Sequence, residues 1–198
     1  MELPKHKTLI PLFEELRGPR VVVRPYRLED AEEEFAAIEE SRQHIRPWLP
    51  WVDQTLTIDD SRDFILRTQA NWLTREQDLT VGVFEASSGR YLGGSGLHVR
   101  GWDVPAFEIG YWLRTSAEGH GYMAETVKLL TDFAFASLGA QRVTIRCDAR
   151  NTRSAAVAER LGFVCEARLR NEMRSHATGE LRDTLVFSLI PSDPRWPA

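Results

Sequence analysis

The hydrophobic period of the chain changes between residues 107 and 134. Phe107, Ile109, Tyr111 and Leu113 alternate with Glu108, Gly110 and Trp112, so that the two sets lie on opposite faces. A period of two residues is typical of a strand. Met123, Val127, Leu130 and Ala134 then recur at helical spacing, which predicts a helix ending near Gly139. The chain therefore passes from a strand through a glycine-containing turn into a helix.

The same patterns predict the other elements. Strands are expected at residues 20–26, 79–85, 91–99, 141–147, 164–170 and 184–189, and helices at 28–40, 57–74 and 152–161. Together they predict one domain over residues 20–190, with an α/β (α+β) three-layer fold in which about four helices flank a mixed sheet of about seven strands. Residues 1–19 are expected to form a loosely attached N-terminal arm, and residues 191–198 a C-terminal tail.

The turn before the long helix is suited to an anion. Gly119 and Gly121 lie at the helix start, where unpaired backbone N–H groups and the positive end of the helix dipole favour a phosphate. The acidic residue of a dinucleotide fold and the lysine of a nucleoside-triphosphate loop are both missing from this sequence. Either the glycines serve only the turn, or they bind another phosphate-bearing cofactor.

Composition narrows the class of protein. The chain has 198 residues, of which 42% are hydrophobic, and this is enough for one buried core. A formal net charge of −4 gives no general case for nucleic-acid binding. Its two cysteines form neither a zinc pattern nor a disulfide framework, and no run of about 20 apolar residues occurs. We therefore expect a soluble protein of a reducing cytoplasm, without a membrane partner.

Several motifs, in order along the chain, resemble one family. They are EIGYWL from residue 108, EGHGYMAE from 118, RCDARNTRSAAVAERLGF from 146 and DTLVFSL from 183. The sequence resembles the GNAT superfamily of N-acetyltransferases, and within it the Rim-type ribosomal-protein N-terminal acetyltransferases. The resemblance implies a mostly antiparallel sheet whose fourth and fifth strands splay apart. The pantetheine arm of acetyl-CoA would enter that cleft along the backbone of Trp112, Leu113 and Arg114.

The resemblance also implies cofactor-binding residues around the glycine turn. The pyrophosphate would lie on the backbone of Gly119, His120, Gly121, Tyr122, Met123 and Ala124. Ser116 occupies the position where the family has Gln or Arg, so this one side-chain contact is in doubt. Asn151 matches the asparagine that hydrogen-bonds the cofactor arm, although an asparagine here could equally begin a helix.

The catalytic candidates follow from the needs of acetyl transfer to an amine. Many family members place a tyrosine where this chain has Ala158, whereas the Rim-type pattern places a serine at Ser154. That hydroxyl could donate a hydrogen bond to the departing thiolate, or it could be an ordinary helix serine. Glu108 is the candidate base, with Glu172 as a rival, and each could instead be an ordinary paired carboxylate.

Other reactive side chains receive no role. Cys147 is expected to be a buried core cysteine rather than an acetyl carrier, because no adjacent base is evident. The histidines show no metal-ligand spacing, so no metal is expected.

The aromatic loop from Ser41 to Trp51 contains two prolines, which should end the preceding helix. By resemblance, Arg46, Trp48, Leu49 and Trp51 would frame the acceptor site, and the tryptophans could also anchor the loop to the core. We expect an acetyl-CoA-dependent enzyme that acetylates a protein or peptide N-terminal α-amine by direct attack in a ternary complex. A small-molecule amine as acceptor, or a non-catalytic acyl-CoA sensor, are the alternatives. A homodimer is left open.

Overall fold

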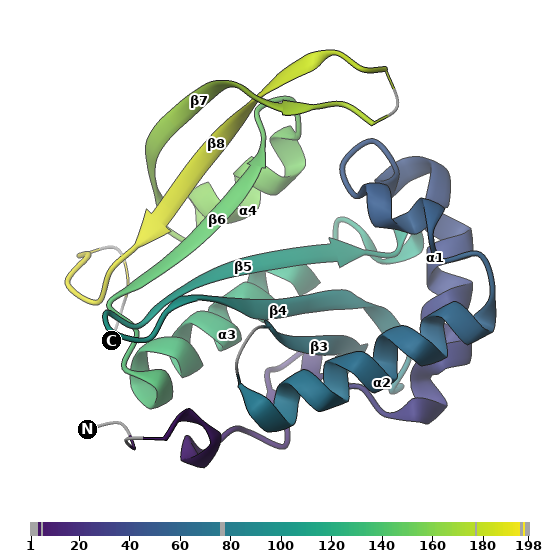
Figure 1. Ribbon diagram of the computed structural model, residues 1–198, viewed down its shortest axis with the longest axis horizontal. Helices are drawn as coiled ribbons and strands as arrows, with labels where there is room; N and C mark the ends of the chain where they lie inside the picture. Colours follow the sequence, from purple (N-terminus) through teal and green to yellow (C-terminus); the bar gives the residue numbers. More distant parts are fainter. Residues whose placement is uncertain (1–3, 5, 76–77, 177, 195, 197–198) are drawn as a thin grey trace.

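The computed structural model describes residues 4, 6–75, 78–176, 178–194 and 196. In this described part of the chain, one eight-stranded sheet has the order β1-β2-β3-β4-β5-β6-β8-β7 (Figure 1). Its strands are β1 (Leu16–Arg17), β2 (Val21–Arg24), β3 (Asp78–Glu85), β4 (Tyr91–Gly101), β5 (Ala106–Leu113), β6 (Arg142–Asp148), β7 (Val164–Arg174) and β8 (Leu181–Leu189). The sequence predicts seven of these, and the two-residue β1 is the addition.

All neighbouring strands are antiparallel except β5 and β6. These two pair in parallel from Ala106 opposite Arg142 to Glu108 opposite Thr144, and among the described residues the pairing goes no further. Beyond Glu108 the strands diverge, and β6, β7 and β8 rise away from β5 (Figure 1). The splayed pair of strands expected from the family resemblance is confirmed.

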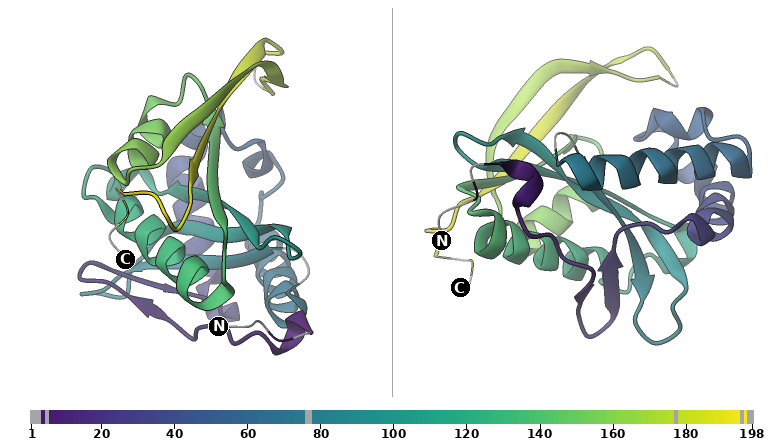
Figure 2. Two further views of the ribbon diagram at one scale, coloured as in Figure 1. Left: turned by 90° about the vertical axis from the view of Figure 1, so that its left-hand side faces the viewer. Right: turned by 60° about the horizontal axis from the view of Figure 1, so that its bottom comes forward.

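Four α-helices complete three layers. They are α1 (Ala31–Ile45), α2 (Ile58–Thr74), α3 (Tyr122–Leu138) and α4 (Thr152–Arg160), and the short 3-10 helices are η1 (Lys7–Leu9), η2 (Leu28–Asp30), η3 (Pro50–Asp53) and η4 (Thr115–Ala117). Helices α1 and α2 cover one face of the sheet, and α3 and α4 cover the other (Figure 2). None of the described helices combines the length and the hydrophobicity needed to cross a bilayer.

The core follows the predicted periodicities. The stripe of α3 formed by Met123, Val127, Leu130 and Ala134 is buried against Phe107 and Ile109 of β5. The capping box of α2 is present: the Thr57 hydroxyl accepts from the Asp60 N–H at 3.3 Å, and the Asp60 carboxylate accepts from the Thr57 N–H at 2.8 Å. Local sequence therefore fixes where α2 begins.

Three elements extend at least three residues further than the sequence predicts, and one of them is β8, which begins at Leu181 and not at 184. Helix α1 continues through Ile45, so the first part of the segment after residue 40 is helical and not loop. The reason is that Ile38, Ser41 and Ile45 are all buried, so the inward stripe continues after the last acidic residue. Strand β7 likewise continues to Arg174, past the predicted end at residue 170, because it pairs with the full length of β8.

The N-terminal segment packs more closely than a loose arm would. Ile10 is only 2% exposed, and the Phe13 ring contacts the rings of Trp72 and Phe133 with centroid distances of 5.2 and 4.7 Å. These apolar side chains pack against the core, although the polar, proline-containing sequence around them gives no periodic pattern that would predict it. Residues 1–3 and 5 of the arm, and 195, 197 and 198 of the tail, lie outside the described residues. The domain limits stay a prediction.

Candidate active site

A cleft of about 1160 Å³ opens where β5 and β6 part. Of the residues singled out from sequence, it is lined by Trp48, Leu49, Glu108, Trp112, Leu113, Gly119, Gly121, Tyr122, Met123, Ala124, Cys147, Asn151, Ser154 and Glu172. Arg46, Trp51, Arg114 and His120 are not part of its lining. The fold thus gathers these residues from β5, α3, β6, α4, β7 and the connecting loops into one concave site.

The glycine turn forms one wall of the cleft. Gly121 is the N-cap of α3 with φ of 76°, and Gly119 has φ of 82°, so both adopt the left-handed conformation that favours glycine. No backbone N–H from residue 119 to residue 124 donates to an acceptor within the described part of the chain. These groups and the positive end of α3 are therefore available to a negatively charged ligand.

Arg20 and Glu125 hold this turn in place. The Arg20 Nε lies 2.7 Å from Glu125 Oε2, and Arg20 Nη1 donates to the His120 carbonyl oxygen at 2.9 Å. A Cβ on Gly121 would lie 2.9 Å from Arg20 Nη1, whereas one on Gly119 would meet nothing within 4 Å. Glycine at 121 is therefore favoured by the backbone conformation, and a Cβ there would also displace the exposed end of the Arg20 side chain.

Asn151 begins α4 on the opposite side of the cleft. Its Oδ1 accepts from the Ser154 N–H at 3.1 Å, so the helix-starting interpretation of this asparagine is correct. Its side-chain nitrogen donates to no acceptor among the described residues. That amide group remains free for a ligand in the cleft, so capping does not exclude the cofactor-binding interpretation.

The serine candidate lies beside a tyrosine that the sequence did not single out. Ser154 Oγ and the Tyr111 hydroxyl oxygen are 3.0 Å apart, and the Tyr111 hydroxyl also donates to the Ser154 carbonyl oxygen at 3.0 Å. Burial raises the pKa of Tyr111 well above its ordinary value, and burial also raises the pKa of Cys147 to about 11. Cys147 is thus a neutral thiol near pH 7, a poor nucleophile, as the sequence predicts.

The two candidate bases lie at different places on the cleft. Glu108 is the last residue of β5 that pairs with β6, and its side chain is 19% exposed. Its Oε2 lies 3.2 Å from Arg100 Nε. Glu172 on β7 forms an ion pair with Arg146 of β6. Close to Glu108, His98 Nδ1 lies 2.8 Å from Asp78 Oδ1, and a Cβ on Gly110 would lie 2.8 Å from His98 Nε2. The sequence alone gave His98 no partner, because Asp78 is brought to it by the pairing of β3 with β4.

The loop after α1 contributes to the cleft through only some of its residues. The Trp51 ring packs on Trp112 at a centroid distance of 5.8 Å, so Trp51 anchors the loop. Arg46 turns away and lies 3.0 Å from Asp53 in its own loop. Trp48 lines the cleft, with the Arg182 guanidinium 5.5 Å from its ring centroid. Anchoring and site-forming roles therefore belong to different tryptophans.

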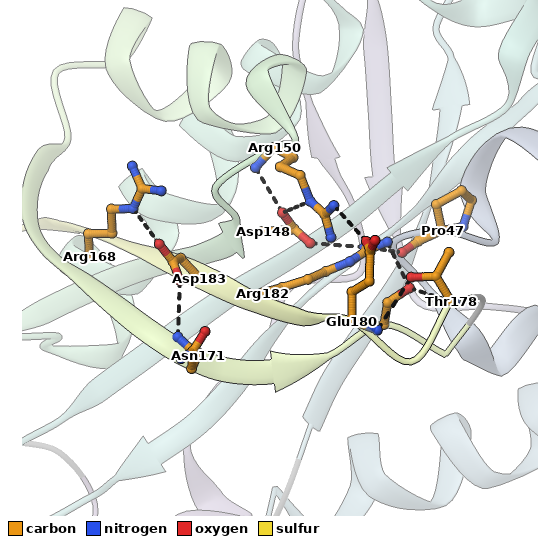
Figure 3. A network of polar contacts seen from close by, with 10 residues as sticks. Pro47, Asp148, Arg150, Arg168, Asn171, Thr178, Glu180, Arg182 and Asp183 are labelled. Atoms are coloured by element: carbon orange, nitrogen blue, oxygen red, sulfur yellow. Dashed lines mark hydrogen bonds and ion pairs between the residues drawn. The ribbon is translucent and has the colours of Figure 1, made fainter.

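Arg182 joins this loop to the far side of the cleft. Its Nη1 donates to the Pro47 carbonyl oxygen at 2.8 Å and lies 2.9 Å from Asp148 Oδ2 of β6 (Figure 3). Its Nη2 donates to the Ser175 hydroxyl at 2.8 Å. One buried guanidinium thus links β8, β6 and the loop after α1 across the opening of the cleft.

A second cross-link lies beside the glycine turn. Glu118, directly before Gly119, accepts from His44 Nε2 of α1 at 2.8 Å and forms an ion pair with Arg153 of α4. Sequence patterns could not predict this contact, because its three residues come from separate elements. Arg153 brings a positive charge next to the unpaired N–H groups of the turn.

Arg114 points away from the cleft. Its guanidinium pairs with Glu40 of α1. Its backbone N–H donates to the Leu92 carbonyl oxygen at 2.8 Å. The Arg114 pair lowers the pKa of Glu40 to about 2. Ser116 also turns to neighbouring side chains, since its N–H donates to Glu40 at 2.8 Å and its hydroxyl accepts from Arg90 at 2.6 Å. The Arg114 carbonyl oxygen also accepts from the Ala117 N–H at 3.0 Å, so both backbone groups of Arg114, which follows the end of β5, already have partners.

Comparison with known proteins identifies the family of the chain. The family model described as an acetyltransferase (GNAT) domain matches residues 20–164. The N-acetyltransferase YjcK of Bacillus subtilis (strain 168), named as probable, is 32% identical over 181 residues, covering 90% of this chain and 98% of YjcK. YdaF of the same strain, provisionally named a ribosomal N-acetyltransferase, is 29% identical over 173 residues, which are 86% of this chain and 91% of YdaF.

A solved structure shares the fold. The ribosomal L7/L12 α-N-protein acetyltransferase RimL, bound to coenzyme A through a disulfide to one of its cysteines, has a TM-score of 0.81 at 18% identity. The alignment covers 89% of this chain and 97% of that one. The protein belongs to the GNAT acetyltransferase family. Within the described residues, no group of three or more His, Cys, Asp or Glu side chains could hold a metal ion.

Proposed function

We propose that this acetyltransferase transfers the acetyl group of acetyl-CoA to the N-terminal α-amine of a protein or peptide, by direct attack in a ternary complex. The observation that carries the proposal is the meeting of two unpaired backbone surfaces in one cleft. One is the set of free N–H groups from residue 119 to residue 124, and the other is the edge of β5 beyond Glu108. The first suits a pyrophosphate, and the second suits an extended arm that adds to the sheet.

The cosubstrate supplies an activated acyl group on a thioester. Free N–H groups beside Gly119 and Gly121 would bind its phosphates, and the side-chain nitrogen of Asn151, at the start of α4, would donate to the cofactor arm. The edge of β5 at Trp112 and Leu113 would orient the arm so that the thioester reaches the parting of the strands. This arrangement assigns most of the binding to backbone atoms.

Starting from the neutral amine, the reaction moves one proton and two electron pairs: the nitrogen lone pair forms the C–N bond, and the pair of the C–S bond goes to sulfur. As the C–N bond forms, Glu108 would take the proton from the amine, directly or through water, and as the C–S bond breaks its electron pair stays on sulfur. Ser154 would donate a hydrogen bond to the thiolate that forms. The pKa of a protonated α-amine is near 8, compared with about 10.4 for a lysine side chain. An α-amine therefore loses its proton more readily than a lysine does, and a carboxylate is a sufficient base.

The acceptor class is supported by the charges of the cleft. Two of its acidic side chains, Asp148 and Glu172, are already paired with Arg182 and Arg146. A polycationic amine would need unpaired carboxylates, whereas a peptide terminus presents one amine and a backbone that pairs with strands. RimL acts on a protein α-amine and YdaF has a provisional ribosomal name, which favours the same class.

Both cysteines are free, which fits the expected reducing cytoplasm.

The test measures thiol release from acetyl-CoA. The panel contains peptides with free Ser or Ala termini, the same peptides with blocked termini, polyamines and aminoglycosides. Turnover that requires a free peptide terminus is expected, and Glu108→Gln should lower it about a hundredfold. Glu166→Gln is the matched control, because Glu166 of β7 pairs with Arg142 of β6 and neither residue lines the cleft. Turnover with small amines alone would overturn the acceptor class, and binding without turnover would favour a sensor.

A further inference from the structure

Three polar side chains from three elements meet where the sheet opens. Tyr111 comes from β5, Cys147 from the end of β6 and Ser154 from the first turn of α4, and all three line the cleft. Tyr111 lies three residues after Glu108, the last residue of β5 that pairs with β6. Its side chain is on the same side of the strand as those of Phe107 and Ile109. Its ring therefore crosses from the strand to α4, directly beneath the parting of β5 and β6.

Hydrogen counting constrains what this cluster can do. Tyr111 has one hydroxyl proton, and its two neighbouring acceptors are the carbonyl oxygen and the Oγ of Ser154, each at 3.0 Å. When Tyr111 donates to Ser154 Oγ and not to the carbonyl oxygen, the serine proton is free for the neighbouring Cys147 sulfur or for a ligand in the cleft that all three residues line. A hydroxyl that accepts a hydrogen bond becomes a better donor, because the two bonds polarise each other.

Burial preserves the donor. The pKa of Tyr111 lies well above its ordinary value because its phenol is removed from water, so it keeps its proton across the neutral range. Cys147 is also protonated there and places no negative charge beside Ser154. During acetyl transfer the carbonyl oxygen gains negative charge as the amine attacks, and the sulfur gains it as the C–S bond breaks; the sulfur is the group that the proposed function places beside Ser154.

We propose that Tyr111 is a positioning residue that orients and polarises the Ser154 hydroxyl toward the thiolate leaving group. The inference rests on the proposed function, in which Ser154 meets that sulfur. In this step the C–S bond breaks, its electron pair remains on sulfur, and no proton changes atoms: Tyr111 donates to Ser154 Oγ, and Ser154 donates to the thiolate. Many family members have a tyrosine at the position of Ala158, and its hydroxyl meets the leaving thiolate. In this chain Tyr111 would supply part of that stabilisation indirectly, through the Ser154 hydroxyl.

The test uses bound coenzyme A, so it needs no acceptor. Thiolate absorbance is followed against pH as the difference between the complexes with coenzyme A and with desulfo-coenzyme A, which cancels the tyrosines and both protein cysteines. Tyr111→Phe is expected to raise the pKa of the bound thiol by about one unit, a tenfold loss of thiolate stabilisation. Ser154→Ala should raise it at least as much, and adding Tyr111→Phe to that variant should change nothing further.

Two controls separate this role from simple packing. Tyr26→Phe also removes a buried phenol that is hydrogen-bonded to one hydroxyl, Tyr91 at 2.8 Å, and should leave the thiol pKa unchanged. Placing 3-fluorotyrosine at position 111 retains the ring and makes the phenol a stronger donor, so it should lower the thiol pKa. This second substitution keeps the test valid if Tyr111→Phe fails to fold.

Each outcome decides a separate point. A normal thiol pKa in Tyr111→Phe with a raised one in Ser154→Ala would overturn the role of Tyr111 and leave that of Ser154. Equal effects of Tyr111→Phe with and without Ser154 would show that Tyr111 does not act through it, which also overturns the proposal. An unchanged pKa in both single variants, or no binding of coenzyme A, would overturn the proposed function and this inference together.

Discussion

Arg182 of β8 and Asp148 of β6 form an ion pair of 2.9 Å in which the side chains are 10% and 7% exposed. The same guanidinium donates to the Pro47 carbonyl oxygen, so the pair also anchors the loop that carries Trp48. Removing one member of such a pair leaves a buried charge without compensation, which costs far more than the pair contributes.

Arg182→Met should therefore lower the free energy of unfolding by about 3 kcal/mol, as measured by urea denaturation. Without Arg182, the buried Asp148 carboxylate keeps only the more distant Arg150, 3.7 Å away, as its counter-charge, so adding Asp148→Asn should restore part of the loss. Arg168→Met is the matched control, since its ion pair with Asp183 lies on the neighbouring strands with Arg168 65% exposed. It should change stability by less than about 1 kcal/mol. Equal losses in both variants would contradict the importance of burial.

Glu34 predicts a pH dependence of stability. It is 2% exposed, one of its carboxylate oxygens has no hydrogen-bond partner within the described part of the chain, and burial raises its pKa to about 7. A carboxyl whose pKa is higher in the folded state binds a proton that unfolding releases. Its contribution is thus complete below about pH 4.5 and is lost as pH rises toward 7.

Glu34→Gln should accordingly stabilise the protein at pH 8 and change little at pH 5. The shift from 4.5 to about 7 corresponds to roughly 3 kcal/mol at the higher pH. Urea midpoints at the two values measure this, and Glu32→Gln on the same helix, with its side chain 76% exposed, is the control. Parallel pH curves for the parent and Glu34→Gln would exclude Glu34 as the source.

The two glycines of the turn should respond differently to alanine. Gly119→Ala enters open space and should cost only the left-handed strain, about 1 kcal/mol. Gly121→Ala has the same strain and also places its Cβ 2.9 Å from Arg20, so its unfolding free energy should fall further. Calorimetric titration with coenzyme A should show weaker binding for Gly121→Ala than for Gly119→Ala, because displacement of Arg20 disturbs the whole turn. Equal stability of the two variants would contradict this.

Trp48 and Trp51 should separate binding from stability. Trp51→Ala removes the ring that packs on Trp112 and should lower the unfolding free energy by about 2 kcal/mol. Trp48→Ala, at a position that lines the cleft, should instead raise the KM for a peptide acceptor while changing stability little. Steady-state kinetics and urea denaturation of both variants check this division, and the reverse pattern would contradict it.

Sequence patterns predicted the elements whose causes are local. The capping box at Thr57, the alternation of β5 and the apolar stripe of α3 each lie within one stretch of chain, so each could be interpreted without knowing its neighbours. Helix α1 ran past its predicted end because the inward position at Ser41 is filled by a polar residue, which interrupts the apparent stripe. Strand β1 was missed because two residues carry no period, and only the pairing with β2 defines it.

The candidate site was predictable where the backbone decides and not where distant side chains meet. Gly121 could be placed from sequence, since its conformation belongs to a turn. The contact of Tyr111 with Ser154 joins residues 43 positions apart, and that of Arg182 with Asp148 joins residues 34 apart. Such pairs depend on strand order and register, which the strand patterns alone leave open.

The short parallel ladder between β5 and β6 has a consequence for the lifetime of the protein. Among the described residues, three residue pairs connect β5 with β6, from Ala106 opposite Arg142 to Glu108 opposite Thr144. A ligand arm lying between the diverging strands would contact both halves of the sheet. Its binding free energy would add to the free energy needed to separate them. We therefore expect the rate of proteolysis to fall with rising acetyl-CoA, which would couple the abundance of the enzyme to the supply of its cosubstrate.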